Sequence, residues 1–156
     1  MPASATPFSI RAATPEDLPA LLALEQSTPL AAHWSAAHYA SRLQSSRGAA
    51  CFLLAEGQNR ICGFICARIA AREWEIENVV VAEDFRRRGI GARLMNSLIE
   101  QWKQNGGAAL LLEVRASNAA ARAFYHHHGF RQLAQRRAYY RDPVEDAVLY
   151  ALCPGE

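Results

Sequence analysis

The sequence predicts a mixed α/β domain in which helices flank one sheet, and three observations support this prediction. Short apolar runs rich in β-branched residues alternate with amphipathic segments of helical period. The expected order is strand, helix, helix, three strands, helix, strand, helix and two strands, so helices and strands are interleaved. The 156 residues contain no internal repeat and no linker rich in Pro, Gly or Ser. We therefore expect a single domain over 1–156.

The first half of the chain predicts two helices among four strands. One helix begins after Thr14, because Pro15 suits the first helical position and Asp17 the capping-box position. A second, short helix is expected from Ser35 to Leu43. The strands are 8–13, 51–56, 60–70 and 74–82, and the turn GQN makes a hairpin of the second and third.

The second half predicts two helices among three strands. Gly89 opens an amphipathic helix whose large apolar residues recur every four positions up to Trp102, and a pair of glycines ends it. Ser117 is expected to cap the next helix, which Gly129 ends. The strands are 108–114, 130–140 and 146–152.

Composition excludes several classes of protein. Apolar residues make up 51% and charged residues 21%, as in a globular chain rather than a disordered one. The formal net charge of +2 is too small to indicate a nucleic-acid or membrane partner. There is no signal-peptide pattern and no apolar run of membrane-spanning length. We therefore expect a soluble, cytoplasmic protein, a monomer, that binds neither membranes nor nucleic acid directly.

Two features resemble metal sites only superficially. The three histidines at 126–128 are adjacent on a predicted helix, so they point in different directions and cannot converge on one ion. The four cysteines show neither zinc-site spacing nor the density of a disulfide scaffold. Cys62 and Cys66 face the same way on a predicted strand, which favours packing over redox chemistry. We expect buried, reduced thiols and no metal.

The stretch DFRRRGIGARL, residues 84–94, places three arginines before Gly89 and Gly91 at the start of a helix. The first N–H groups of a helix have no partner within it, and the aligned peptide dipoles leave partial positive charge there. Glycine allows an anion to approach the backbone closely, and the arginines add full charges. The stretch therefore predicts a pyrophosphate site.

Two other interpretations of this stretch remain open. An arginine run on a solvated face beside an ordinary loop-to-helix junction would give the same pattern. A dinucleotide-binding fingerprint would need a third glycine where Leu94 stands, although Glu113 lies near the spacing of its ribose-binding carboxylate. A P-loop is excluded, because no Lys-Ser or Lys-Thr follows the last glycine.

Longer segments resemble a known family. VVVAEDFRRRGIGARLM and LLLEVRASNAAARAFYHHHGF resemble the GCN5-related N-acetyltransferases (GNAT), whose acetyl-CoA loop has the pattern Arg/Gln-x-x-Gly-x-Gly/Ala. The ending RRAYYRDPVEDAVLYAL is similar to the RimI-like branch, which acetylates the N-terminal alanine of the small-subunit ribosomal protein bS18. The resemblance implies a central, mostly antiparallel sheet flanked by helices, acetyl-CoA as donor and a ribosomal-protein α-amino group as acceptor.

The resemblance also implies roles for particular residues. Glu113 falls at the position of the general base and Tyr125 at that of the general acid. The positions implied to bind the cofactor are Val79, Val80 and Val81 for the pantetheine arm, Arg86, Arg87, Arg88, Gly89, Ile90 and Gly91 for the pyrophosphate, and Asn118. The sequence departs from the common pattern at Glu83, Arg86 and Tyr150, where proline, glutamine and methionine are frequent. By analogy with oxyanion holes, a backbone N–H of the valine strand would meet the developing oxyanion.

From the residues alone, other roles stay open. Glu113 could belong to an ion pair with Arg115 or another arginine, and Tyr125 could be an aromatic at the edge of the core. A GNAT enzyme could instead acetylate a small-molecule amine or a lysine, and a chain of this kind could bind acyl-CoA or a nucleotide without catalysis. His33 and Trp34 fall in the loop expected beside the acceptor.

The closing turn combines aromatic and acidic residues. They are Tyr139, Tyr140, Asp142, Glu145 and Asp146. We hypothesise that these carboxylates attract a basic acceptor peptide, whereas ordinary turn chemistry would explain them equally well.

Overall fold

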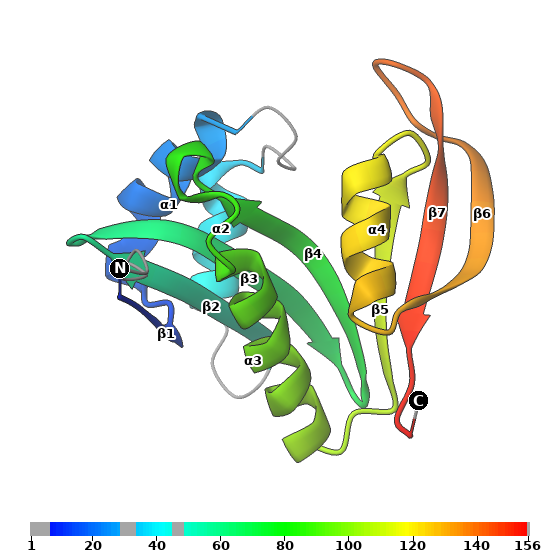
Figure 1. The fold of residues 1–156 in the computed structure, drawn as a ribbon, viewed down its shortest axis with the longest axis horizontal. Helices are drawn as coiled ribbons and strands as arrows, with labels where there is room; N and C mark the ends of the chain where they lie inside the picture. Colours follow the sequence, from blue (N-terminus) through cyan, green and yellow to red (C-terminus); the bar gives the residue numbers. More distant parts are fainter. Residues whose placement is uncertain (1–6, 29–33, 45–48, 156) are drawn as a thin grey trace, which may run out of the picture.

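The computed structural model describes residues 7–28, 34–44 and 49–155, and its strands form one seven-stranded sheet in the order β1-β2-β3-β4-β5-β7-β6 (Figure 1). The strands are β1 Phe8–Ala12, β2 Ala50–Gly57, β3 Arg60–Ala70, β4 Glu73–Val81, β5 Ala109–Arg115, β6 Arg131–Tyr140 and β7 Glu145–Leu152. The helices are α1 Leu18–Gln26, α2 Ala36–Leu43, α3 Ile90–Gln104 and α4 Ala119–His127, with short 3-10 turns η1 Pro15–Asp17 and η2 Glu83–Phe85. The predicted order of elements is confirmed, as is a mostly antiparallel sheet flanked by helices.

Helices cover both faces of the sheet. Tyr39 of α2 packs against the rings of Phe52 on β2 and Phe64 on β3, at centroid distances of 6.4 and 5.9 Å. The thiol of Cys51 on β2 lies 3.4 Å from the Gln101 side-chain oxygen on α3. Because neighbouring residues of a strand point to opposite faces, α2 and α3 lie on opposite sides of the sheet (Figure 1).

β4 and β5, which pair in parallel, separate after a few residues. Pairing joins residues 73–76 of β4 to residues 109–112 of β5, and β4 then continues to Val81 without β5. The two strands diverge beyond this point (Figure 1). In the described part of the chain, one edge of the last five residues of β4 is therefore left without a neighbouring strand.

A β-bulge in β4 lies where the two strands part. On β3, Cys66 faces Asn78 and the next residue, Ala67, faces Ile76, so Glu77 is the extra residue of β4. An extra residue bends its strand and increases the local twist. The bulge therefore turns the end of β4 away from β5.

One predicted helix cap is wrong by one residue. Asn118, not Ser117, caps α4, since its side-chain oxygen accepts a hydrogen bond from the backbone N–H of Ala121 at 3.2 Å. The backbone N–H of Ser117 instead donates to the Glu145 carboxylate of β7. A tertiary contact thus keeps Ser117 in the turn before the helix.

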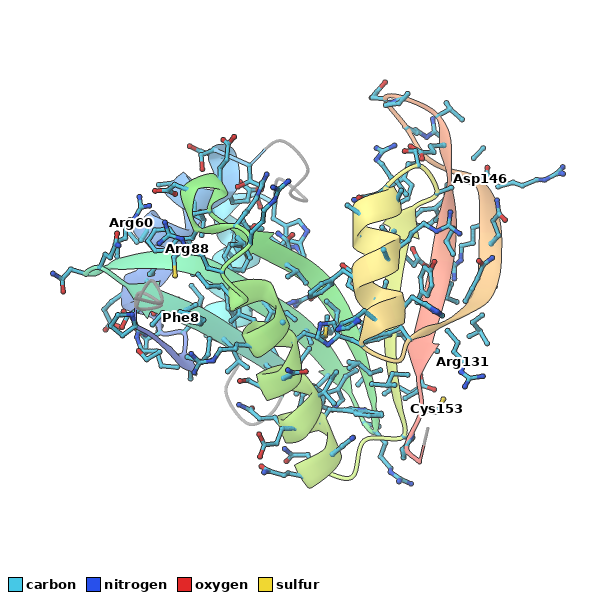
Figure 2. All side chains as sticks on the ribbon, in the orientation of Figure 1. Phe8, Arg60, Arg88, Arg131, Asp146 and Cys153 are labelled. Atoms are coloured by element: carbon cyan, nitrogen blue, oxygen red, sulfur yellow. The ribbon has the colours of Figure 1, made fainter. Side chains whose placement is uncertain are left out.

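The cysteines are free, but one of them is not buried. Cys51, Cys62 and Cys66 lie in the core as predicted, whereas Cys153 is exposed just beyond the end of β7, where no element covers it (Figure 2). Within residues 7–28, 34–44 and 49–155, no group of three or more His, Cys, Asp or Glu could hold a metal ion. None of the helices in those ranges is long and apolar enough to cross a membrane.

Trp102 is the largest fully buried side chain of α3, and we expect it to be essential for stability. Its indole N–H donates to the carbonyl of Ala109 at 3.2 Å, and Gly107 packs against its ring. Trp102→Ala should lower the free energy of unfolding by about 3–5 kcal/mol, because a large cavity is left. Urea unfolding measures this, with the exposed neighbour variant Lys103→Ala staying within about 0.5 kcal/mol of wild type. Equal losses in both variants would contradict the assignment.

Candidate active site

The diverging ends of β4 and β5 enclose a groove of about 1270 Å³. One wall is β4 from Glu75 to Val81, and the other is the end of β5 with the first turn of α4. The β6–β7 hairpin and Trp34 border the same groove, while His33 lies outside the described residues. The predicted site residues that line the groove are Val79, Val80, Val81, Arg86, Glu113, Asn118 and Tyr125. Residues far apart in sequence thus meet at one site.

The β4 wall offers backbone rather than side chains. Val80 is buried and its two neighbours are half-buried, so their side chains belong to the core and its border. Because β5 leaves this edge unpaired, its N–H and C=O groups are available to a ligand with amide groups. The pantetheine arm of acetyl-CoA carries such amides, and this edge therefore fits it.

The glycine loop begins α3 next to this wall. Gly89 is the N-cap of the helix with φ +78°, a left-handed conformation that favours glycine, and a Cβ built there would meet nothing within 4 Å. Arg86, Arg87 and Arg88 are exposed around it. The side chain of Ile90 is buried in the core, so only its backbone can face a pyrophosphate. An exposed helix N-terminus with nearby arginines fits a bound phosphate group.

The three arginines do not occupy equivalent positions. Arg86 lines the groove. The guanidinium of Arg88 instead lies 5.0 Å from the ring centre of Phe85, on which Arg60 also packs at 4.6 Å (Figure 2). We therefore expect Arg86 to contribute more than Arg88 to a ligand in the groove.

Glu113 lies on β5 with a side chain that is 17% exposed. Its carboxylate is 3.5 Å from the Nε of Arg136 on β6. Glu113 therefore forms an ion pair with an arginine, which was one of the alternatives considered above. Hydrogen bonding to Glu113 also raises the pKa of Tyr139. Arg115 pairs with Glu145 instead, at 3.4 Å. Because Arg136 is more than half exposed, its attraction for the carboxylate is screened by water.

Tyr125 lies on α4, on the same side of the groove as Glu113. Its ring packs against Phe130 and Tyr150 at centroid distances of 5.9 and 6.3 Å. Burial raises the pKa of Tyr125 to about 12, with a smaller contribution from Tyr140, so the phenol stays protonated at neutral pH. Tyr150 stands at the position where methionine is frequent in the family pattern. Its hydroxyl accepts a hydrogen bond from Arg122 at 3.0 Å, so it has a polar partner.

The acidic residues of the closing hairpin have different environments. Glu145 is held by Ser117 and Arg115, which keep its pKa low. Asp146 accepts from Gln135 and from the backbone of Ala138, and these bonds lower its pKa. Glu145 lines the groove with its neighbours Asp142 and Pro143, whereas Asp146 does not. Of these acidic residues of the hairpin, Asp142 and Glu145 therefore line the groove.

Sequence reasoning missed the residues that tie β4 to α2. Glu77, the extra residue of the bulge, pairs with Arg42, and Asn78 donates to the hydroxyl of Tyr39. Both β4 residues line the groove. A bulge depends on the register with a neighbouring strand, so no local pattern in the sequence indicated it.

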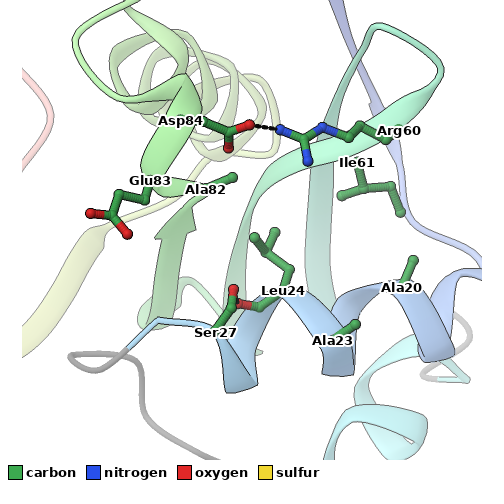
Figure 3. Close-up of a pocket in the computed structure, with 9 residues that line it drawn as sticks. All are labelled: Ala20, Ala23, Leu24, Ser27, Arg60, Ile61, Ala82, Glu83 and Asp84. Atoms are coloured by element: carbon green, nitrogen blue, oxygen red, sulfur yellow. Dashed lines mark hydrogen bonds and ion pairs between the residues drawn. The ribbon is translucent and has the colours of Figure 1, made fainter.

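A second hollow, of about 590 Å³, lies elsewhere (Figure 3). Ala20 and Ala23 of α1 and its C-cap Ser27 form one side, and Arg60, which pairs with Asp84, forms part of the other. None of the predicted site residues lines it. Of the two hollows, only the groove between β4 and β5 is therefore lined by predicted site residues.

The fold and the groove agree with comparisons to known proteins. The sequence pattern of the acetyltransferase (GNAT) family matches residues 18–130. The chain belongs to this family, which confirms the predicted resemblance, and it is an acetyl-CoA-dependent N-acetyltransferase.

Relatives with a named acceptor are similar over nearly the whole chain. The bS18-alanine N-acetyltransferase of Escherichia coli is 38% identical over 138 residues, which cover 87% of this chain and 90% of the relative. The crystal structure of the ribosomal-protein-alanine N-acetyltransferase from Escherichia coli superposes with a TM-score of 0.84 and 33% identity, covering 94% of each chain. The crystal structure of a ribosomal-protein-alanine N-acetyltransferase from Brucella melitensis gives a TM-score of 0.80 at 25% identity, covering 93% of this chain and 99% of that one.

The two glycines of the loop should respond differently to substitution. Gly89→Ala forces alanine into a left-handed conformation and should cost about 1 kcal/mol of stability, while weakening acetyl-CoA binding. At Gly91 an added Cβ would meet Phe124 and Val81 at an ordinary 3.7 Å, so Gly91→Ala should fold at least as well as wild type. Thermal unfolding and calorimetric titration with acetyl-CoA measure both effects. Equal stability of the two variants would contradict this distinction.

Proposed function

We propose that this N-acetyltransferase acetylates the α-amino group of a protein N-terminus, most directly the N-terminal alanine of ribosomal protein bS18. The observation that carries the proposal is the groove, which brings Glu113 and Tyr125 together opposite the free edge of β4. The similarity to bS18-alanine N-acetyltransferases supports the acceptor. The proposal includes a single GNAT domain that acts as a monomer in the cytoplasm, where ribosomal proteins are made.

The donor would lie along β4. The pantetheine arm would pair with the backbone of Val79 to Val81, and the pyrophosphate would meet Arg86 and the N–H groups at the start of α3. Asn118 would contact the cofactor from the opposite wall with the part of its amide that does not cap α4. Acetyl-CoA supplies an activated thioester, so the protein has mainly to position the two reactants.

Glu113 would act as the general base. An α-amino group has an ordinary pKa of about 7.7–8.0, against about 10.4 for lysine, so a carboxylate can help to deprotonate it near neutral pH. Glu113 would accept this proton directly or through a water molecule. The neutral amine then attacks the acetyl carbon, while a backbone N–H of β4 stabilises the negative charge on the carbonyl oxygen. The second proton, which the nitrogen loses as the amide forms, would leave through water and balance the proton that the departing thiol takes up.

Tyr125 would act as the general acid when the carbon–sulfur bond breaks. Its phenol would donate a proton to the departing thiolate, whose thiol has a pKa of about 8.5 if it resembles cysteine. Burial raises the pKa of Tyr125, and the same apolar surroundings disfavour the thiolate. The two pKa values therefore move in the same direction, which keeps the proton transfer feasible.

The acceptor would enter from the end of the groove bordered by the hairpin and Trp34. Asp142 of the hairpin is an acidic side chain on this border, whereas Arg86 lies close to the start of α3. Arg86 would favour the donor phosphates, and Asp142 would favour a basic peptide.

The acceptor is tested by mass spectrometry. A peptide with the bS18 N-terminus, which starts with alanine and contains an internal lysine, is incubated with the enzyme and acetyl-CoA beside the same peptide with a blocked N-terminus. We expect one added acetyl group on the free peptide and none on the blocked one. Addition to both peptides would indicate lysine acetylation, and addition to neither would remove bS18 as the acceptor.

The proton-transfer residues are tested by kinetics. Glu113→Gln and Tyr125→Phe should each lower kcat by about 10²- to 10⁴-fold with little loss of acetyl-CoA binding, since each removes one proton-transfer group. The exposed neighbour variant His126→Ala should keep the wild-type rate.

The pH profile gives an independent test of Tyr125. The acid is lost only as the pH rises through its raised pKa of about 12. The wild-type rate should therefore not fall through ionisation of this tyrosine below about pH 10, the ordinary pKa of a phenol. A fall that begins below this pH and disappears in Tyr125→Phe would contradict the assignment.

A further inference from the structure

Two side-chain contacts tie the bulge of β4 to α2. Arg42 donates from Nε and from one terminal nitrogen to the two carboxylate oxygens of Glu77, at 2.7 and 3.1 Å. The side-chain amide of Asn78 donates to the hydroxyl of Tyr39 at 2.9 Å. Two successive residues of β4 are therefore anchored by one helix on the face of the sheet opposite α3.

Both contacts are shielded from water. The side chains of Arg42 and Glu77 are 19% and 15% exposed, and Tyr39 is fully buried. A two-pronged guanidinium–carboxylate pair fixes direction as well as distance. His38 of α2 also lies 4.0 Å from the Glu77 carboxylate, but only Arg42 hydrogen-bonds to both of its oxygens. Removing Arg42 would take this two-pronged partner from a partly buried carboxylate, so the pair is more than a surface contact.

These contacts lie where the sheet gives β4 the least support. Pairing with β5 ends at Ile76, and the extra residue Glu77 has no partner on β3. A shift of one residue would turn the side chains of the following valines to the other face, and would move every N–H along the free edge. The direction of this edge thus depends on what holds Glu77 and Asn78.

We propose that Arg42 is a positioning residue for catalysis, which through Glu77 fixes the bulge and directs a β4 backbone N–H toward the acetyl carbonyl. The inference rests on the role proposed above for this backbone. Arg42 itself does not line the groove and would touch neither substrate. Its contribution would be the geometry of the hydrogen bond to the carbonyl oxygen, which strengthens as negative charge develops there.

The same strand provides a matched control. Arg68 of β3 pairs with Glu75 of β4 at 2.8 Å, but both side chains are more than 40% exposed. The two residues face each other in regular pairing, before the bulge. Arg68→Gln therefore removes a guanidinium–carboxylate pair from β4 without disturbing the residues that follow Glu77.

The test compares Arg42→Gln, Arg42→Lys and Arg68→Gln with wild type. For Arg42→Gln we expect kcat to fall by about 10- to 100-fold, since a small displacement of a catalytic group costs this much. The KM and Kd for acetyl-CoA should stay within about twofold, because most of its contacts remain. Arg42→Lys keeps the positive charge but loses the two-pronged guanidinium, so its kcat should lie between those of Arg42→Gln and wild type. The kcat of Arg68→Gln should match that of wild type.

A spectroscopic measurement separates positioning from stability and needs no acceptor. Acetyl-CoA labelled with a heavy carbon isotope at its carbonyl is bound to each variant, and the carbonyl stretch is recorded by infrared difference spectroscopy. A hydrogen bond to the carbonyl oxygen lowers this frequency. Arg42→Gln should move it toward the value of free acetyl-CoA, whereas Arg68→Gln should leave it at the wild-type value.

The outcomes are distinct. An unchanged carbonyl frequency in Arg42→Gln would overturn the proposal, and so would a rate loss explained by weaker acetyl-CoA binding or by unfolding. A change confined to the KM of a basic peptide would also overturn it, because it would show that Arg42 acts only by neutralising Glu77. If wild type fails to acetylate the bS18 peptide, the proposed acceptor fails, but the infrared comparison still decides the role of Arg42.

Discussion

The site depends on the loss of pairing between β4 and β5 after four residues. Parallel strands in the middle of a sheet ordinarily satisfy each other's backbone groups, and leaving them unpaired in an apolar place is costly. Here β4 continues to Val81 beside a groove, so its free edge can be satisfied by a ligand or by water. A defect in the sheet thereby becomes the surface that fits an amide-containing cofactor arm.

The helices around the groove keep the two strands apart. α3 begins at Ile90 after its N-cap Gly89, and α4 begins at Ala119 after its N-cap Asn118, so each helix starts shortly after one of the two diverging strands. The ring of Phe124 on α4 lies close to Gly91 on α3, at the distance of an ordinary van der Waals contact from where a Cβ would stand. Packing of these helices against the core therefore sets the width of the groove.

Charged groups of both signs line the groove. Arg86 and the start of α3 contribute positive charge, whereas Glu75, Glu77 and Glu145 are each paired with an arginine. Among these charges, Tyr125 is held among aromatic rings that keep its phenol protonated, while Glu113 stays within reach of water and polar neighbours. In the proposed mechanism, these different surroundings would allow a proton donor and a proton acceptor to share one site.

The sequence by itself determined the order of elements, the glycine loop at the start of α3 and the family, because these depend on local signals. Apolar periodicity marked α3, and Gly89 marked a backbone position that other residues enter only with strain. One local prediction was wrong, because Ser117 was expected to cap α4. Its backbone N–H instead donates to Glu145 of β7, a tertiary contact that the local sequence does not indicate. Only the tertiary structure decided the bulge at Glu77, its anchoring by Arg42 and the ion pair between Glu113 and Arg136. The two ion pairs join residues more than twenty positions apart, the bulge depends on the register between β3 and β4, and neither leaves a periodic trace in one strand.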